Sequence, residues 1–171
     1  YAVRQELGGG VLLSQIHDFD YAMWMFGRPE KLFCIGGQLS NLKIDVEDSA
    51  QVLMQFKNKG KPLPVTISMD YHRWPSARII SVVGDEGSIL CDLESMELVI
   101  NDRIRNSVDR QTFSTFSRND CFIDEMSNFL AFVLGKEDIT SDLESGLESL
   151  RVALAAKESM NSGKVQKILW T

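Results

Sequence analysis

Cysteine and histidine are scarce in this chain, with three and two copies among 171 residues. The cysteines, Cys34, Cys91 and Cys121, are odd in number and far apart, and they form no CxxC motif. Neither a disulfide framework nor a zinc site is indicated by this pattern. We expect reduced, mostly buried thiols, as is typical of cytosolic proteins, and hence a cytoplasmic location.

Basic runs and long apolar runs are missing as well. The chain carries 24 acidic and 18 basic residues, a net charge of −6, with no stripe of Lys and Arg among aromatic residues. Nucleic acid and anionic membranes are therefore excluded as expected partners. No apolar run approaches the ~20 residues that span a bilayer. A hydrophobic content of 44% is enough for one compact core.

The segment after the three glycines at positions 8 to 10 predicts an amphipathic helix. Its apolar residues recur at helical spacing and share one stripe, which should lie on the core. Gly27 with Pro29 two residues later is typical of a helix end. The stripe consists of Leu12, Ile16, Phe19, Met23 and Phe26.

A second stripe lies roughly opposite on the same helix and contains Ser14, His17, Tyr21 and Trp24. A hydroxyl, an imidazole, a phenol and an indole on one face favour a docked partner or a ligand. The alternative is a surface or interdomain histidine that a neighbouring group satisfies.

From residue 31 to about residue 100 the apolar period changes to two, which predicts strands. AQVLMQF (50 to 56) alternates in this way, and KNKGKP (57 to 62) and GDEGS (84 to 88) are typical of hairpin connections. We expect about six strands in an open, largely antiparallel sheet. They are predicted near 31–42, 50–57, 63–70, 77–83, 87–91 and 96–101.

Residues 102–119 are polar and irregular, which predicts a long loop. Two helices are expected after it, the second opening at a capping box, Ser141 to Glu144. Residues 163–169 could return as a short edge strand. The order of elements predicts an α+β fold of two layers, with helices on one face of the sheet and the other face open.

The sequence lacks residues that a metal site, a dinucleotide-binding site or a serine hydrolase would need. His17 and Asp20 could reach one metal ion, but His72 is the only other histidine. GGGVLL does not match GxGxxG, so a dinucleotide cradle is missing. Ser14 and His17 are one turn apart, yet no nucleophile elbow accompanies them, which argues against a serine hydrolase.

The segment GGGVLLSQIHDFDYAMWMFG (8 to 27) resembles the opening motif of the C-terminal domain of the Gfo/Idh/MocA oxidoreductases, the glucose-fructose oxidoreductase and inositol dehydrogenase family. Further segments resemble the same domain in the same order, over nearly all of the chain. They are VEDSAQVLMQF (46 to 56), RWPSARIISVVGDEGSILCDL (73 to 93), FIDEMSNFLAFVLGKE and SGLESLRVALAAKESMNSGKVQKI (145 to 168).

This resemblance implies that residues 1–171 form a single C-terminal domain for substrate binding and oligomerisation, with a dihydrodipicolinate-reductase-like fold. The N-terminal Rossmann domain that binds NAD or NADP would be absent from this chain, in keeping with a start at Tyr1 without an initiator Met. A homo-oligomer through the open face of the sheet is expected.

The resemblance also implies the site. His17 takes the place of the catalytic histidine, a general acid/base, since imidazoles titrate near neutral pH. Ser14 stands where family members carry an aspartate, which removes a charge that would favour a protonated imidazole. Lower activity, an altered substrate or lost catalysis stay open. The expected substrate-binding residues are Tyr21, Trp24, Arg4 and Arg73.

The leading hypothesis is the substrate half of an NAD(P)-dependent oxidoreductase that acts on a sugar or a nucleotide sugar. The alternative is a non-catalytic sugar-binding or dimerisation module. The isolated chain is expected to be inactive and to bind neither NAD nor NADP appreciably, because nothing in it cradles a pyrophosphate.

Overall fold

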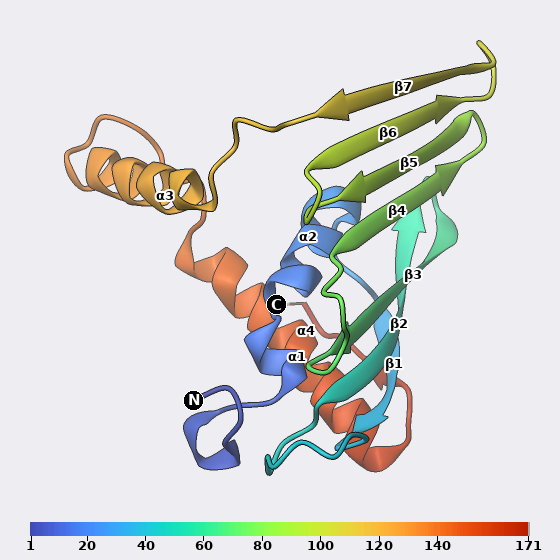
Figure 1. The fold of residues 1–171 in the computed structure, drawn as a ribbon. Helices are drawn as coiled ribbons and strands as arrows, with labels where there is room; N and C mark the ends of the chain where they lie inside the picture. The colour runs from blue at the N-terminus through green and yellow to red at the C-terminus, as the bar shows by residue number, and fades with distance from the viewer. Residues whose placement is uncertain (171) are drawn as a thin grey trace. The chain divides into compact units, whose positions relative to one another are not determined.

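The computed structural model describes residues 1–170, and the chain divides into two compact units. The first unit joins Tyr1–His72 to the C-terminal residues from Ser141 onward, and the second is Arg73–Thr140. Figure 1 shows the first unit in blue to teal and red, and the second in green to orange.

The first unit contains a four-stranded sheet and helices on one of its faces. Its strands lie in the order β3-β2-β1-β8, and every pair is antiparallel. The elements are η1 (Gln5–Leu7), α1 (Val11–Ser14), α2 (His17–Phe26), β1 (Lys31–Gly37), β2 (Ser49–Asn58), β3 (Lys61–Asp70), α4 (Leu143–Ser162) and β8 (Gln166–Lys167).

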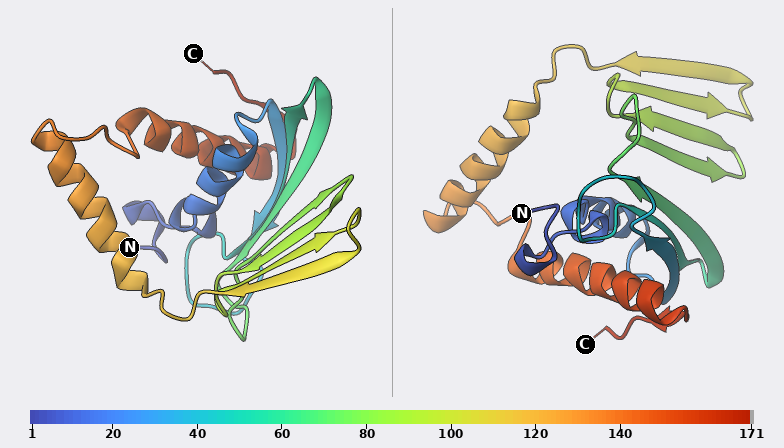
Figure 2. Two further views of the ribbon diagram at one scale, coloured as in Figure 1. Left: turned by 90° about the horizontal axis from the view of Figure 1, so that it is seen from above. Right: turned by 60° about the horizontal axis from the view of Figure 1, so that its bottom comes forward.

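Alternation along β2 produces the core of this unit. Ala50, Val52, Met54 and Phe56 are each at most 1% exposed, whereas Leu53 between them is 50% exposed. Every second side chain therefore points toward the helices and the rest toward the open face. Figure 2 shows α4 and α2 on the same side of these strands. The predicted alternation and the open face are confirmed.

The predicted helix over residues 11–26 forms in two pieces. Leu12 and Phe19 of the predicted apolar stripe are fully buried, and Ile16, Met23 and Phe26 pack against the same cluster, which confirms the stripe. The helix breaks at Gln15 (φ −106°, ψ 33°). The side chain of Gln15 donates a hydrogen bond to the carbonyl of Asp70 (3.2 Å), so a contact with β3 accompanies the break.

The second unit contains a sheet in the order β4-β5-β6-β7 and the helix α3. Sequence analysis placed about six strands in one sheet, whereas the strands divide into two sheets of four. The elements are β4 (Ile79–Gly84), β5 (Gly87–Asp92), β6 (Glu97–Asp102), β7 (Ser107–Thr112) and α3 (Arg118–Val133).

The prediction of an irregular loop over residues 102–119 was wrong. Ser107–Thr112 forms β7, which pairs with β6 from Glu97↔Thr112 to Asp102↔Ser107. All six residues of β7 are exposed, and five of them are polar or charged, so the strand carries no apolar alternation. Main-chain pairing at a sheet edge forms it, and a pattern of buried side chains cannot report such a strand.

Two further predictions need correction. The first residue of the helix cap at 141–144 is Asp142 rather than Ser141, since the Asp142 carboxylate accepts the Ser145 N–H (2.9 Å). The expectation of mostly buried thiols was wrong, because Cys34 is buried but Cys91 is half-buried and Cys121 is exposed. Among the described residues no helix is long and apolar enough to cross a membrane.

Candidate active site

The helix α2 presents two chemically different faces. Phe19 and Ala22 are buried against the sheet and α4. His17, at the first turn, keeps 38% of its side chain exposed, and Tyr21 is half-buried. Burial of the apolar face at about 1.5–3 kcal/mol for each large side chain anchors the helix, and the imidazole lies outside that core.

The His17 ring lies among groups of its own helix. Its Nε2 is 3.5 Å from Oδ1 of Asp18, and its ring centroid is 5.9 Å from that of Tyr21, tilted by 56°. Asp18 therefore places a carboxylate beside His17, and Ser14 does not supply one.

Ser14 is held by two partners. Its Oγ donates to the carbonyl of Gly10 (2.8 Å) and accepts a hydrogen bond from the Tyr71 hydroxyl (2.6 Å). Burial raises the pKa of the Tyr71 phenol, which therefore stays protonated, although the bond to Ser14 acts in the opposite direction. Sequence analysis missed Tyr71, which directly follows β3 and joins the end of that strand to the helix.

The glycine segment does not fit a pyrophosphate, because its backbone donors already have partners. The N–H of Gly10 bonds to the Ala2 carbonyl (2.9 Å), that of Val11 to the Glu47 carbonyl (3.0 Å), and that of Leu12 lies 3.4 Å from Glu47 Oε1. A Cβ on Gly10 would lie 2.1 Å from the same carboxylate oxygen. This carboxylate takes the place that an anion would need.

Glu47 belongs to an acidic turn that fixes the segment in front of the helix. Its side chain is 4% exposed and lies 3.5 Å from Lys157 Nζ of α4. Burial alone would raise the pKa of Asp48, but hydrogen bonds from Ser40 and from the Leu39 N–H outweigh it and hold that pKa below its usual range. Asp45 accepts the N–H of Gln5 (2.8 Å). These carboxylates are structural.

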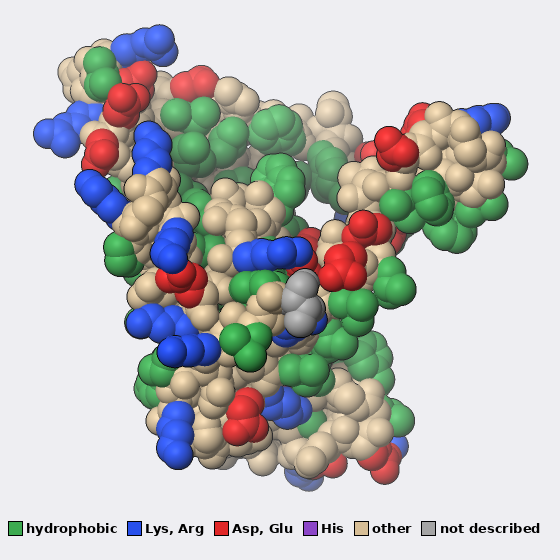
Figure 3. Space-filling model, turned by 180° about the vertical axis from the view of Figure 1, so that it is seen from behind, with side chains coloured by type: hydrophobic (Ala, Val, Ile, Leu, Met, Phe, Trp, Pro, Cys, Tyr) green, Lys and Arg blue, Asp and Glu red, His purple; other side chains and the backbone are tan. Residues whose placement is uncertain are grey.

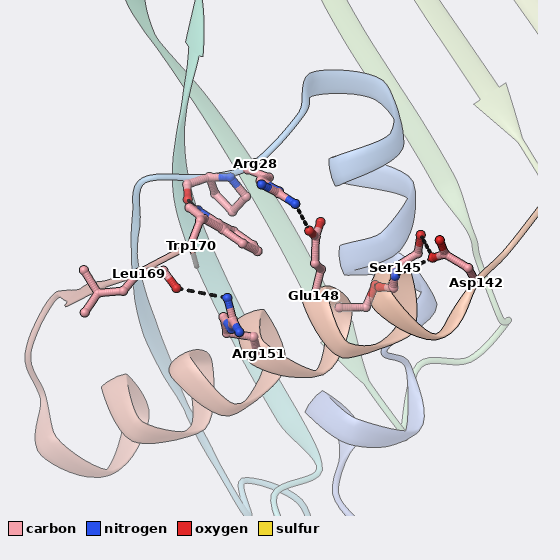
Figure 4. Close-up of polar contacts among 9 residues, drawn as sticks. Arg28, Asp142, Ser145, Glu148, Arg151, Leu169 and Trp170 are labelled. Atoms are coloured by element: carbon pink, nitrogen blue, oxygen red, sulfur yellow. Dashed lines mark hydrogen bonds and ion pairs between the residues drawn. The ribbon is translucent and has the colours of Figure 1, made fainter.

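A second set of contacts holds α2 on α4. Ser149 of α4 donates to Asp20 Oδ1 (2.9 Å). Just beyond the end of α2, Arg28 pairs with Glu148 of α4 (Figure 4). The guanidinium of Arg28 also lies 5.3 Å from the Trp170 ring. Asp20 therefore has a structural role, in the contact between α2 and α4.

The remaining expected site residues are spread over both units. Trp24 is 86% exposed, near the end of α2. Arg4 lies in the turn before the glycines and is 3.8 Å from Glu6 Oε1. Arg73 belongs to the second unit and is exposed. Within the first unit the structure brings together His17 with Tyr21 and Ser14 with Tyr71. Across the described residues no cluster of three His, Cys, Asp or Glu could hold a metal ion.

Comparison with known proteins identifies the domain. Residues 2–168 match the family model described as "Oxidoreductase family, C-terminal alpha/beta domain". No curated protein matches the chain.

Solved structures share the fold at low identity. An Agrobacterium radiobacter oxidoreductase in complex with NAD+, L-tartaric acid and magnesium has a TM-score of 0.73 and 20% identity over 90% of this chain and 47% of its own. The Bordetella pertussis WlbA dehydrogenase, in complex with NADH and UDP-GlcNAcA, has a TM-score of 0.71 and 18% identity over 95% and 46%. UDP-N-acetylglucosamine 3-dehydrogenase GnnA from Acidithiobacillus ferrooxidans has a TM-score of 0.70 and 19% identity, over 86% of this chain and 45% of its own.

The chain spans less than half the length of these three structures. The match to the family model covers nearly the whole sequence, and the fold is shared with the similar solved structures. The chain therefore belongs to the Gfo/Idh/MocA oxidoreductase family, as its C-terminal α/β domain.

Proposed function

We propose that this domain is the substrate-binding and catalytic half of an NAD(P)-dependent oxidoreductase acting on a sugar or nucleotide sugar. His17 is the general acid/base that moves a proton to or from a substrate hydroxyl or carbonyl. The observation that carries this proposal is the partly exposed imidazole beside Asp18, on a helix whose opposite face packs on the core.

The two similar dehydrogenases support the substrate class, since one is in complex with a UDP-sugar and the other is named for one. The nicotinamide cofactor would be bound by residues outside this chain, because the donors of the glycine segment are occupied. Within this chain, Ser14 and Tyr71 position the helix, and Tyr21, Trp24, Arg4 and Arg73 bind the substrate.

The open face of the first sheet also carries a shallow apolar groove of about 370 Å³, lined by residues that include Phe33, Leu53 and Pro64. An apolar groove on an exposed sheet face favours a partner surface. We propose that copies of the enzyme associate through this face.

The test uses an intact enzyme that includes both domains. His17→Ala should lower turnover about a hundredfold or more, the usual scale of acid/base assistance. Trp24→Ala, on the same exposed face, should raise KM with a smaller change in kcat. Unchanged turnover in His17→Ala would remove the imidazole from the mechanism. An intact wild-type protein that binds sugar without oxidising it would instead favour the non-catalytic module.

A further inference from the structure

The junction between α1 and α2 lies directly before His17. The helix α1 ends at Ser14, and only Gln15 and Ile16 separate it from the first residue of α2. Ile16 packs against the apolar core, and Gln15 is the residue at which the helical backbone is interrupted. The conformation of Gln15 therefore sets the direction in which α2 continues from α1.

Two hydrogen bonds tie this junction to the end of β3. The side-chain amide of Gln15 donates to the Asp70 carbonyl (3.2 Å), and the Tyr71 hydroxyl donates to Ser14 Oγ (2.6 Å). Two neighbouring residues of the junction thus bind two neighbouring residues at the strand end. We call this pair of bonds the junction clamp. Both bonds are part-buried, so water competes for them less than it does at an exposed site.

The end of β3 is a firm support for the junction clamp. All ten residues of β3, Lys61–Asp70, pair with β2. Directly after the strand, the Tyr71 N–H bonds to the carbonyl of Asp48 (2.9 Å). Asp48 is fully buried, and its carboxylate accepts the N–H of Leu39 (2.8 Å). The strand end is therefore held by its own contacts, and the clamp fixes the junction relative to it.

Gln15 also bonds directly to the first turn of α2. Its carbonyl accepts the N–H of Asp18 (3.0 Å). The Asp18 carboxylate in turn lies 3.5 Å from Nε2 of His17. One residue therefore binds β3 through its side chain and the turn that carries the imidazole through its main chain.

The middle of α2 has supports that do not involve the junction. Phe19 and Ala22 are buried in the core, and Ser149 of α4 donates to Asp20 (2.9 Å). These contacts should keep α2 on the core when the Gln15 side chain no longer bonds to β3. The expected result of that loss is a shift of the first turn, with His17, in a protein that stays folded.

We propose that Gln15 is a positioning residue for His17, because its side-chain and main-chain hydrogen bonds fix the first turn of α2 and hence the place of the imidazole. This inference rests on the proposed function, in which His17 moves the proton. Misplacement of a reacting group by about 1 Å can cost about a hundredfold in rate. Proton transfer is sensitive to such a shift, whereas substrate binding is shared among several other residues.

The test uses the intact two-domain enzyme and an isosteric substitution. Gln15→Met keeps the length of the side chain but cannot donate to the Asp70 carbonyl. It should lower kcat about tenfold and change KM less than about twofold. Gln15→Glu keeps the shape and places an acceptor against the same carbonyl, so it should lower kcat at least as much.

Gln38 provides the matched control. Its side-chain amide also donates to a main-chain carbonyl, that of Leu42 (3.1 Å), but in the connection between β1 and β2. Gln38→Met removes the same kind of bond and should leave kcat and KM unchanged. Circular dichroism should show wild-type secondary structure in all three variants. Equal losses of kcat in Gln15→Met and Gln38→Met would overturn the proposal.

A double-mutant cycle with His17→Ala shows whether Gln15 acts through the imidazole. In the His17→Ala enzyme, Gln15→Met should lower the remaining turnover less than about twofold, since no imidazole is left to position. A tenfold loss in both backgrounds would overturn the proposal, because Gln15 would then affect a step that does not involve His17.

The outcomes separate this inference from the proposed function. Wild-type turnover in His17→Ala overturns the proposed function and the inference with it. A large loss in His17→Ala, with wild-type kcat in Gln15→Met and Gln15→Glu, overturns only the inference. A loss of kcat in Gln15→Met that disappears in the His17→Ala background supports it.

Discussion

The two units are built from the same kinds of elements but differ in how they bury them. In the first unit, α1, α2 and α4 pack with the sheet around fully buried residues such as Phe19, Phe56 and Val152. In the second, Val99 is the one buried hydrophobic residue, the apolar side chains of α3 are about half exposed (Figure 3), and those of the strands are half-buried or exposed. Secondary structure therefore forms in both, but a cohesive core exists only in the first unit.

The largest expected effect tests this contrast with one substitution in each unit. Phe19→Ala should lower the free energy of unfolding by about 3–5 kcal/mol, because it leaves a cavity in a closed core. Phe129→Ala in α3 should cost less than about 0.5 kcal/mol at concentrations where the chain is monomeric. Urea denaturation measures both. Equal losses would show that the second unit has a core of its own.

Two glycines with positive φ sharpen the comparison at the level of the backbone. Gly10 (φ 114°) lies against Glu47, whereas Gly135 (φ 66°), after α3, has open space around it. Gly10→Ala should cost about 2–4 kcal/mol, since overpacking adds to backbone strain. Gly135→Ala should cost about 1 kcal/mol. Similar values in thermal unfolding would mean that Glu47 moves aside without cost.

Carboxylates provide a comparison that depends on pH. Asp48 is fully buried, and its pKa in the folded protein is lowered. Its carboxylate therefore stabilises the fold at pH values above its unfolded pKa of about 3.9. This stabilisation is lost as the pH falls through the folded-state pKa. Asp48→Asn should cost about 1–3 kcal/mol at pH 7 and less in acid. Asp85→Asn, on the exposed β4–β5 turn, should leave the free energy of unfolding unchanged both at pH 7 and in acid. A deficit in Asp48→Asn that is independent of pH would contradict this account.

The smallest expected effect concerns two side-chain hydrogen bonds. Tyr71 and Ser14 are part-buried and 2.6 Å apart, whereas Asn101 and Ser88 of the second unit are exposed and 3.1 Å apart. A double-mutant cycle with Tyr71→Phe and Ser14→Ala should give a coupling of about 1 kcal/mol. The Asn101→Ala and Ser88→Ala cycle should give a coupling near zero. A larger coupling energy for Asn101 and Ser88 than for Tyr71 and Ser14 would show that Tyr71 does not hold the helix.

Sequence patterns predicted most of the first unit because its helices and strands bury one face, and the buried positions are apolar. The stripe from Leu12 to Phe26 and the alternation from Ala50 to Phe56 each reflect contact with one core. The short strand β8, which pairs with β1, was also predicted. In the second unit β7 has no buried face, so the sequence pattern did not predict that this segment pairs as a strand.

The site was predictable only in part. The opposing faces of α2 follow from helical geometry, and the structure bears out the buried face. The partners of Ser14 were not predictable, since Tyr71 is 57 residues away and the contact depends on how β3 ends. The roles of His17, Tyr21, Trp24, Arg4 and Arg73 stay proposals, because they require a substrate and a second domain.

The most direct test of the central claim is chemical rescue of His17→Ala in the intact two-domain enzyme, with turnover measured against the concentration of added imidazole. The account predicts a loss of about a hundredfold or more that added imidazole partly restores and that an equal concentration of sodium chloride does not. A His17→Ala enzyme that turns over at the wild-type rate without imidazole would contradict it.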